Sequence, residues 1–496
     1  MVDHDFVIED FQRRLRMISR HGMGLSVDVY SPNLFELVQA LGRQGLQPGY
    51  LEVFKATTTA LTSVRNACPN IPMAYHGEGL WLPQPDLQES PFFQQDVGEM
   101  ITQLDRIQSL WLNHECAMKQ MAGYSFGTYL PPLYTPQSAE VVAENIATIQ
   151  QAMDRQSYRT DGTTPLFLLE MPPLTYFAAG TMPIARFFRR VAALASCGLV
   201  LDIGHLWTVY RYTAASRQIS LERFVREFLD EFPLERVVEI HVAGLASQGS
   251  REDQAEGEGL PDWIDAHAAP IPSVLFTMLE EVLAHSNLVS LRGVALEVDT
   301  KSIDLIVEEY GEAVRRFSPR IQQAMAREMT VEEMKVLAHG PSSLVEEPLL
   351  QSHRQQLRDD YERYAQIISG RAPITGPEWQ EVASNPAGLT CYRTFYLPYE
   401  ILHWGGELTE MCPHTCRVLT ERGVSLEEFV VFWFRLPRPL SHSYDFFLLK
   451  IERFLEFVAE RAPDSLVLAE QESDMLRMAY AQANEVGELV MGEERD

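Results

Sequence analysis

Basic residues are scarce in this 496-residue chain, which has 41 Lys and Arg against 69 Asp and Glu. The formal net charge is therefore −28 at pH 7. An acidic excess of that size repels phosphate backbones and anionic lipid. We expect no nucleic acid among the main partners, and the same charge disfavours a nuclease.

Cysteine is also scarce, and the 6 cysteines form no dense disulfide framework. The longest uncharged apolar run, Val191 to Leu201, falls well short of the roughly 20 residues that a membrane-spanning helix needs. The acidic start of the chain has no apolar segment of the kind found in secretory signals. These absences predict a cytoplasmic protein with no membrane partner.

Short apolar, β-rich runs alternate with segments of helical period over the first 320 residues, which is the pattern of parallel βα units. The helical segments include 33–44, 140–155, 184–196, 221–232 and 272–284. Eight strands with intervening helices predict an α/β fold, specifically a (β/α)8 TIM barrel. The expected strands are Gly24–Tyr30, Tyr50–Phe54, Pro72–His76, Leu110–His114, Leu166–Met171, Leu199–Ile203, Val237–Val242 and Val294–Val298.

The barrel is expected to occupy residues 1–320 and to close with a helix over 302–317, which Ser318 and Pro319 would end. Residues 321–376 are polar and helical in period, with a Gly- and Pro-rich break at 370–377, and we interpret them as a helical linker. Residues 377–496 are rich in aromatics at helical spacing. We expect a smaller, mainly helical C-terminal domain there.

Residue types that bind metals gather where the predicted strands end, the face on which barrel enzymes build their active sites. Three carboxylates among them lie inside apolar runs, where an unpaired charge would be costly and a metal ion would neutralise it. We predict nine metal ligands, namely His76, His114, Glu170, Asp202, His205, His241, Asp265, His267 and Glu297.

Nine converging groups exceed what one ion needs and predict two or three ions. The mixture of imidazole and carboxylate favours zinc, iron or manganese over calcium or magnesium. Any one of these histidines alone is more often a hydrogen-bonded core residue than a ligand. Their shared position at strand ends is what favours a metal site.

Seven short segments resemble the multinuclear non-heme iron-dependent oxidative enzymes, a family that includes the methanobactin-type enzymes that modify ribosomally made peptides. The resemblance covers about residues 20–320 and implies a barrel of the xylose-isomerase-like group. The segments are Tyr75–Leu80, Leu112–Glu115, Leu169–Pro172, Leu201–His205, Glu239–Gly244, Ile264–His267 and Leu296–Asp299.

This resemblance implies an oxidoreductase with two or three iron ions (Fe2+/Fe3+) and O2 as co-substrate. Its substrate would be a precursor peptide, with a cysteine side chain as the expected target. Glu78 and Glu115, close to predicted ligands, are the candidate catalytic residues that orient imidazoles or carry protons. A fused C-terminal domain, residues 377–496, is a candidate for capturing the leader of the precursor.

Within the same group of barrels the nine residues also look like those of endonuclease IV, a trinuclear zinc enzyme. That likeness implies His76, His114 and Glu170 on one ion, and Glu170 bridging to a second. The second ion would be held by Asp202, His241 and Glu297, and the third by His205, Asp265 and His267. The alternative function is therefore a zinc- or manganese-dependent hydrolase or sugar isomerase on the same barrel.

Overall fold

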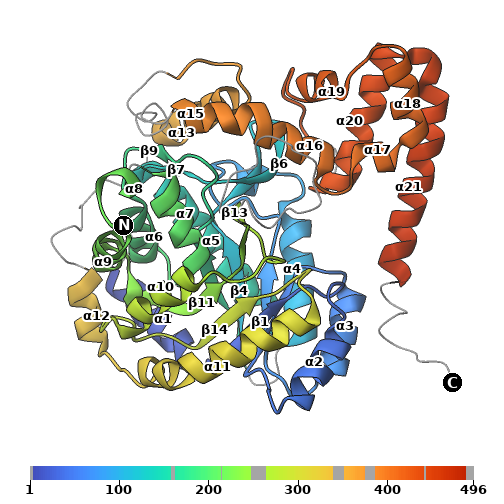
Figure 1. Ribbon diagram of the computed structural model, residues 1–496. Coiled ribbons are helices and arrows are strands. Elements are labelled where there is room, and N and C mark those ends of the chain that lie inside the picture. Colours follow the sequence, from blue (N-terminus) through green and yellow to red (C-terminus); the bar gives the residue numbers. More distant parts are fainter. Residues whose placement is uncertain are drawn as a thin grey trace.

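The computed structural model describes residues 4–157, 162–213, 215–246, 264–338, 351–374, 386–440 and 443–486. Eight parallel strands form a closed barrel in the order β1-β14-β11-β10-β8-β4-β3-β2 (Figure 1). They confirm the predicted TIM barrel, and the ends of each lie within three residues of those of an expected strand. Their bounds are β1 Gly22–Val27, β2 Leu51–Phe54, β3 Met73–Gly77, β4 Trp111–Glu115, β8 Leu166–Glu170, β10 Gly198–Asp202, β11 Val237–Val242 and β14 Gly293–Glu297.

Helices connect the strands around the outside of the barrel, because parallel strands need crossover connections. The five expected helices that precede residue 302 all form. The helices of this half are α1 His4–Leu15, α2 Leu34–Arg43, α3 Thr58–Ala67, α4 Phe93–Ile107, α5 Pro136–Gln156, α6 Ile184–Leu194, α7 Ile203–Tyr212, α8 Ala215–Gln218, α9 Leu221–Glu231, α10 Ser273–Ala284 and α11 Ile303–Met325.

The predicted end of the barrel's last helix is wrong. Helix α11 continues through Pro319 to Met325. Proline lacks the N–H that would bond one turn back and therefore disfavours this continuation. Ile321, Ala324 and Met325, which follow it, are buried in the barrel's core cluster. Burial of these side chains outweighs the missing hydrogen bond.

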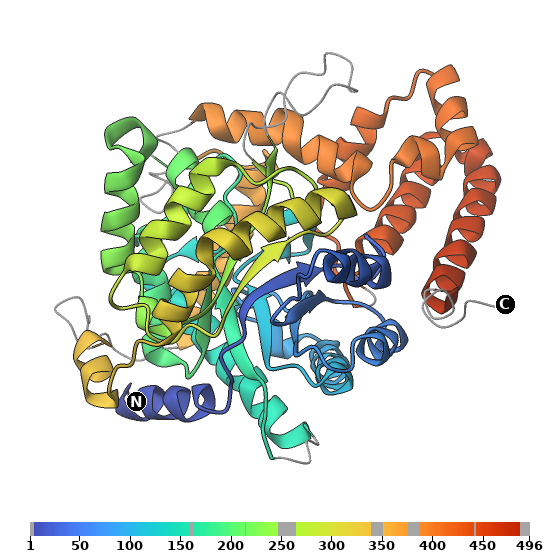
Figure 2. The ribbon, with the colours of Figure 1, turned by 60° about the horizontal axis from the view of Figure 1, so that its bottom comes forward.

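Helix α1 covers the amino-terminal end of the barrel interior, with α12 (Val331–Ala338) beside it (Figure 2). Its apolar face packs on side chains that point inward from the strands, including Trp111, Leu168 and Val200. The guanidinium of Arg236 also lies 4.0 Å from the centre of the Phe11 ring. Apolar packing therefore fills this end of the barrel.

A second apolar core joins the C-terminal helices to the opposite end of the barrel. It contains Phe126 of the antiparallel pair β5 (Met118–Met121) and β6 (Tyr124–Leu130), together with Tyr364 and Phe454. The helices are α13 Gln351–Ile368, α15 Pro386–Cys391, a π-helical turn Tyr392–Tyr396, α16 Leu397–His403, α17 Leu408–Met411, α18 Pro413–Glu421, α19 Leu426–Trp433, α20 Phe446–Arg461 and α21 Leu466–Val486.

The expected helical C-terminal region is therefore confirmed, and α13, α15 and α16 lie across one end of the barrel (top in Figure 1). Residues from all three predicted segments contribute to the second core, since α13 belongs to the predicted linker. The exact domain bounds remain a prediction, and part of the expected break, at 375–377, lies outside the described residues. Among the described residues no helix is long and apolar enough to cross a membrane.

Candidate metal centre

Eight of the nine predicted ligands lie together at the carboxyl ends of the barrel strands. Glu170 at the end of β8 is central to one half of the group. Its carboxylate lies 3.3 Å from His76 Nε2 and 3.2 Å from His241 Nδ1. The amide of Asn113 also donates to it, at 2.6 Å. Glu170 is therefore placed to bridge neighbouring ligand groups.

The other half of the group is built around Asp265 and His267. His267 Nε2 lies 3.2 Å from Asp265 and 3.4 Å from Glu297. His205 Nε2 lies 3.4 Å from Asp265. Glu297 in turn lies 3.3 Å from His241 Nδ1, which joins this half to the first.

The turn from β10 into α7 positions two of these groups at once. Asp202 ends the strand and caps the helix, because its carboxylate accepts the backbone N–H of His205. The His205 ring is fixed by contact with the carbonyl oxygen of Met171, 2.6 Å from Nδ1. A helix cap that follows a barrel strand thus sets a carboxylate and an imidazole side by side.

His114 lies apart from the other eight. Its Nε2 accepts the backbone N–H of Leu80 at 3.1 Å, and its Nδ1 lies 3.0 Å from the carbonyl oxygen of Glu115. Side chains alternate across a strand, so Asn113 and Glu115 share the inward face of β4. Glu115 pairs in register with Glu170 on β8. The role of His114 stays a prediction. The geometry favours Glu115 as the β4 side chain that faces the candidate centre.

The titratable groups of the centre are crowded and buried, and the pKa values of several of them are shifted from their ordinary values. Burial raises the pKa of Asp202 to about 8. Burial and the charge of Glu170 raise the pKa of Glu115 to about 7. Burial lowers the pKa of His76, but hydrogen bonding to Glu170 and the neighbouring carboxylates raise it overall to about 9.

Metal ions fit this donor set. Among the described residues, Asp202 Oδ2, Asp265 Oδ1 and Glu115 Oε2 are buried without a hydrogen-bond partner. Glu170, Asp202 and His241 each place a ligand atom within 4.8 Å of the others. Buried carboxylate oxygens without donors are what a bound cation satisfies.

The candidate catalytic residues differ in their surroundings. Glu78 forms an ion pair with Lys119 and accepts the Tyr129 hydroxyl at 3.2 Å. Burial alone would raise the pKa of Glu78, but Lys119 lowers it to about 2. Burial and the charges of Glu115 and Glu78 hold the pKa of Tyr129 well above its usual value. Tyr129 thus lies between the two predicted catalytic carboxylates.

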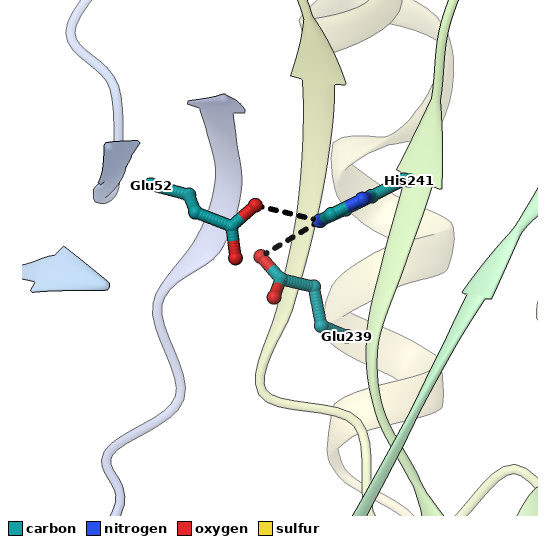
Figure 3. A group of neighbouring side chains, drawn as sticks. All are labelled: Glu52, Glu239 and His241. Atoms are coloured by element: carbon teal, nitrogen blue, oxygen red, sulfur yellow. Dashed lines mark ion pairs between the residues drawn. The ribbon is translucent and has the colours of Figure 1, made fainter. Parts of the chain in front are cut away.

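Two buried carboxylates of the interior were not among the predicted ligands. Glu52 on β2 and Glu239 on β11 lie 3.0 Å and 3.5 Å from His241 Nε2 (Figure 3). Glu170 lies at the other ring nitrogen, Nδ1. Both lie inside apolar runs, as Glu170, Asp202 and Glu297 do. The occurrence of a carboxylate inside an apolar run would therefore have identified Glu52 and Glu239 as candidates too.

A parallel barrel with histidines and carboxylates at the carboxyl ends of its strands defines the class of barrel enzymes that suits metal-dependent chemistry. The profile of one family, described as RiPP precursor modification enzyme MbnB/TglH/ChrH, matches residues 36–318. The chain belongs to this family of enzymes that act on ribosomally made peptides, in agreement with the resemblance found in the sequence.

Curated relatives carry a less specific description. A UPF0276 protein of Paraburkholderia phytofirmans is 27% identical over 260 residues, which cover 50% of this chain and 74% of the relative. A UPF0276 protein of Caulobacter vibrioides is 25% identical over 209 residues, which cover 42% of this chain and 63% of the relative. Neither description names a reaction.

Solved structures with a similar barrel include endonuclease IV from Thermus thermophilus, with 16% identity and a TM-score of 0.35 over 61% of this chain and 99% of that one. D-psicose 3-epimerase from Clostridium cellulolyticum gives 10% identity and a TM-score of 0.35 over 60% of this chain and 99% of that one. At these low identities and TM-scores, neither likeness indicates a reaction for this chain.

Proposed function

We propose that this chain is an iron-dependent oxidase that uses O2 to modify a side chain of a ribosomally made precursor peptide, with cysteine as the expected target. Membership of the peptide-modifying family supports the substrate class. The single structural observation behind the metal dependence is the continuous set of contacts among eight His, Asp and Glu side chains at one end of the barrel.

The residues of this chain would hold two or three ions around Glu170 and Asp265. Bound iron would supply redox chemistry and an open coordination position for dioxygen. The mixture of imidazole and carboxylate ligands suits iron, with zinc or manganese as the alternatives. Glu115, whose pKa is near 7, is placed to hold or accept a proton close to Glu170.

The C-terminal helices are the proposed site for the leader of the precursor peptide. The Tyr396 hydroxyl, next to α16, lies 3.4 Å from the Thr128 hydroxyl on β6. Lys119, which pairs with Glu78, lies 5.5 Å from the ring centre of Trp404, and Trp404 is 52% exposed. A peptide held along these helices would therefore lie close to the metal centre.

We also place the protein in the cytoplasm. All six cysteines are free thiols, and five of them are buried. Free thiols in this number are typical of a reducing compartment.

The decisive experiment combines metal analysis with oxygen uptake. Purified protein should contain two or three equivalents of iron, and it should consume O2 when given a short Cys-containing precursor peptide encoded beside its gene. Glu170→Gln should lower both iron content and oxygen uptake. Glu280→Gln is the matched control, because Glu280 pairs with Arg316 and Arg320 on the outer surface.

Zinc-replete protein that consumes no oxygen with any peptide would reject the oxidase and favour the hydrolase. Mass spectrometry of the peptide supplies a separate readout. An oxidised product loses hydrogen or gains oxygen, whereas a hydrolysed product gains the mass of water.

A further inference from the structure

His241 has carboxylates on both edges of its ring. Its Nδ1 lies 3.2 Å from Glu170 and 3.3 Å from Glu297, on the side of the metal centre. Its Nε2 faces deeper into the barrel, 3.0 Å from Glu52 Oε1 (Figure 3). An imidazole that binds a metal through one nitrogen keeps its proton on the other, and that N–H needs an acceptor.

The carboxylate of Glu52 is held in place from its far side. The Ser26 hydroxyl donates to Oε1 at 3.0 Å, and the Trp111 indole N–H lies 3.4 Å from Oε2. Glu52 is fully buried, and its strand is paired in register with β1 and β3. Its position is therefore set by the barrel wall and does not depend on a bound metal.

Glu239 is the second carboxylate near the same nitrogen, but it is farther away, at 3.5 Å. The hydroxyl of Tyr50 donates to it. Tyr50 itself occupies space that only glycine leaves free, because a Cβ added at Gly24 or Gly293 would lie within 2.6 Å of its ring atoms. Glu239 is thus engaged with Tyr50, and Glu52 is the carboxylate nearer to His241 Nε2.

We propose that Glu52 is a positioning residue. Its carboxylate lies 3.0 Å from His241 Nε2 but has no hydrogen bond to it in this structure, and it would accept the Nε2–H once His241 binds a metal ion through Nδ1 together with Glu170 and Glu297. This inference rests on the proposed function in taking His241 as a ligand. It assigns to Glu52 a role in metal binding without direct contact with the ion. Ser26 and Trp111 support that role by holding the carboxylate.

A rival arrangement uses the same three residues differently. Glu52, Glu239 and His241 each place a ligand atom within 4.8 Å of the others. If they bound a cation of their own, Nε2 would be a ligand and could not carry a proton. The two arrangements differ in the number of ions lost when Glu52 or Glu239 is changed.

The test is metal titration of the full chain with Co2+, monitored by the visible absorption of the bound ion, on wild type, Glu52→Gln and Glu239→Gln. Removing an outer partner of a ligating histidine weakens metal binding by about 10–100-fold. For Glu52→Gln we expect a loss of Co2+ affinity of this size at one ion, with an altered Co2+ spectrum and an unchanged number of bound ions. Glu239→Gln should stay within a few-fold of wild type.

Ser26→Ala serves as a second variant, since it loosens Glu52 without touching His241. It should shift affinity in the same direction as Glu52→Gln but by less, which keeps the test decisive if Glu52→Gln does not fold. Loss of one equivalent of Co2+ in both Glu52→Gln and Glu239→Gln would overturn the proposal in favour of the rival cation site. Wild-type affinity and spectrum in Glu52→Gln and Ser26→Ala would also overturn it.

These outcomes separate this inference from the proposed function. Wild-type protein that binds no Co2+ and contains no iron would reject the metal-dependent function itself. Wild-type protein that binds Co2+ normally, with no effect of changing Glu52, would reject only the positioning role.

Discussion

On β4, the adjacent residues His114 and Glu115 face opposite sides of the barrel wall. Both ring nitrogens of His114 contact backbone groups, the N–H of Leu80 and the carbonyl oxygen of Glu115. The Glu115 side chain lies on the same face of β4 as Asn113, whose amide donates to Glu170. A one-residue difference along a strand decides whether a side chain reaches the metal centre.

We therefore predict different effects for two neighbouring substitutions. Glu115→Gln should weaken binding at one ion by about tenfold or more, as a loss inside the centre. His114→Ala should leave metal stoichiometry unchanged and lower the free energy of unfolding by about 1–3 kcal/mol, because the Leu80 N–H loses its buried acceptor. Metal titration and urea denaturation measure the two effects. Loss of an ion in His114→Ala would instead support His114 as a metal ligand.

At this scale the sequence indicates which polar side chains lie at strand ends, but it does not indicate which face of β4 points into the barrel. Glu170, Asp202 and Glu297 were identifiable because charges inside apolar runs need a partner. The choice between His114 and Glu115 depends on which face of β4 points inward. That is fixed by pairing with β3 and β8, which no short motif contains.

At the scale of single elements, helix α20 contains a buried lysine. Lys450 is fully buried and donates to the carbonyl oxygens of Trp404 and Gly406, in the turn after α16. Burial lowers its pKa from 10.5 to about 7. Helix α20 is thereby attached to the loop that lies next to Lys119 and Glu78.

This lysine predicts a pH dependence of stability. Between pH 7 and 10.5 the unfolded chain binds a proton at Lys450 that the folded chain does not, so stability should rise with pH in that window by up to about 1.4 kcal/mol per pH unit. Lys450→Met should remove this contribution to the slope. Urea denaturation at pH 7.5 and 9.5 measures it, with the exposed Lys55→Met as control. An identical slope in wild type and Lys450→Met contradicts the prediction.

Strands and helices with a regular hydrophobic pattern could be predicted from the sequence, but the residues at which they end could not. The eight barrel strands follow from apolar runs between amphipathic helices. Helix α11 passes Pro319 because residues beyond it are buried in the core, and such burial is a tertiary effect. Local sequence rules miss an effect of that kind.

For the whole molecule, the candidate metal centre lies at the end of the barrel where the second core packs. Burial, and in second place the charges of neighbouring carboxylates, raises the pKa values of Asp202 and Glu115, so ionised carboxylates here are costly without a cation. A ligand that binds only the folded state stabilises it by mass action. Metal binding should therefore stabilise the entire barrel.

We predict that chelation lowers the melting temperature of the full-length protein. At free metal about 1,000 times above Kd, the folded state gains about 4 kcal/mol per site. Differential scanning calorimetry with Fe2+ under anaerobic conditions, or with Zn2+, should show the increase. Calcium is the control and should raise the melting temperature little, because imidazole ligands disfavour calcium. Equal melting temperatures with and without Fe2+ or Zn2+ would contradict the prediction.

The division of the chain could be predicted only in part. Aromatic spacing indicated a helical C-terminal region, but not that Tyr364 of α13 and Phe126 of β6 would share its core. Contacts between residues hundreds of positions apart leave no local pattern. A truncation at residue 376 would uncover the apolar side chains of β5 and β6, so it is a poor test of leader binding.

Helix α1 and its apolar contacts fill one end of the barrel, so we expect solvent to reach the candidate site from the other end. Under the proposed function, cations, dioxygen and peptide would all approach the candidate site from the side of the C-terminal helices. The order of loading becomes important for that reason. A peptide already bound there should slow the arrival of the ions, and an enzyme charged with metal before it meets its peptide should be the more active form.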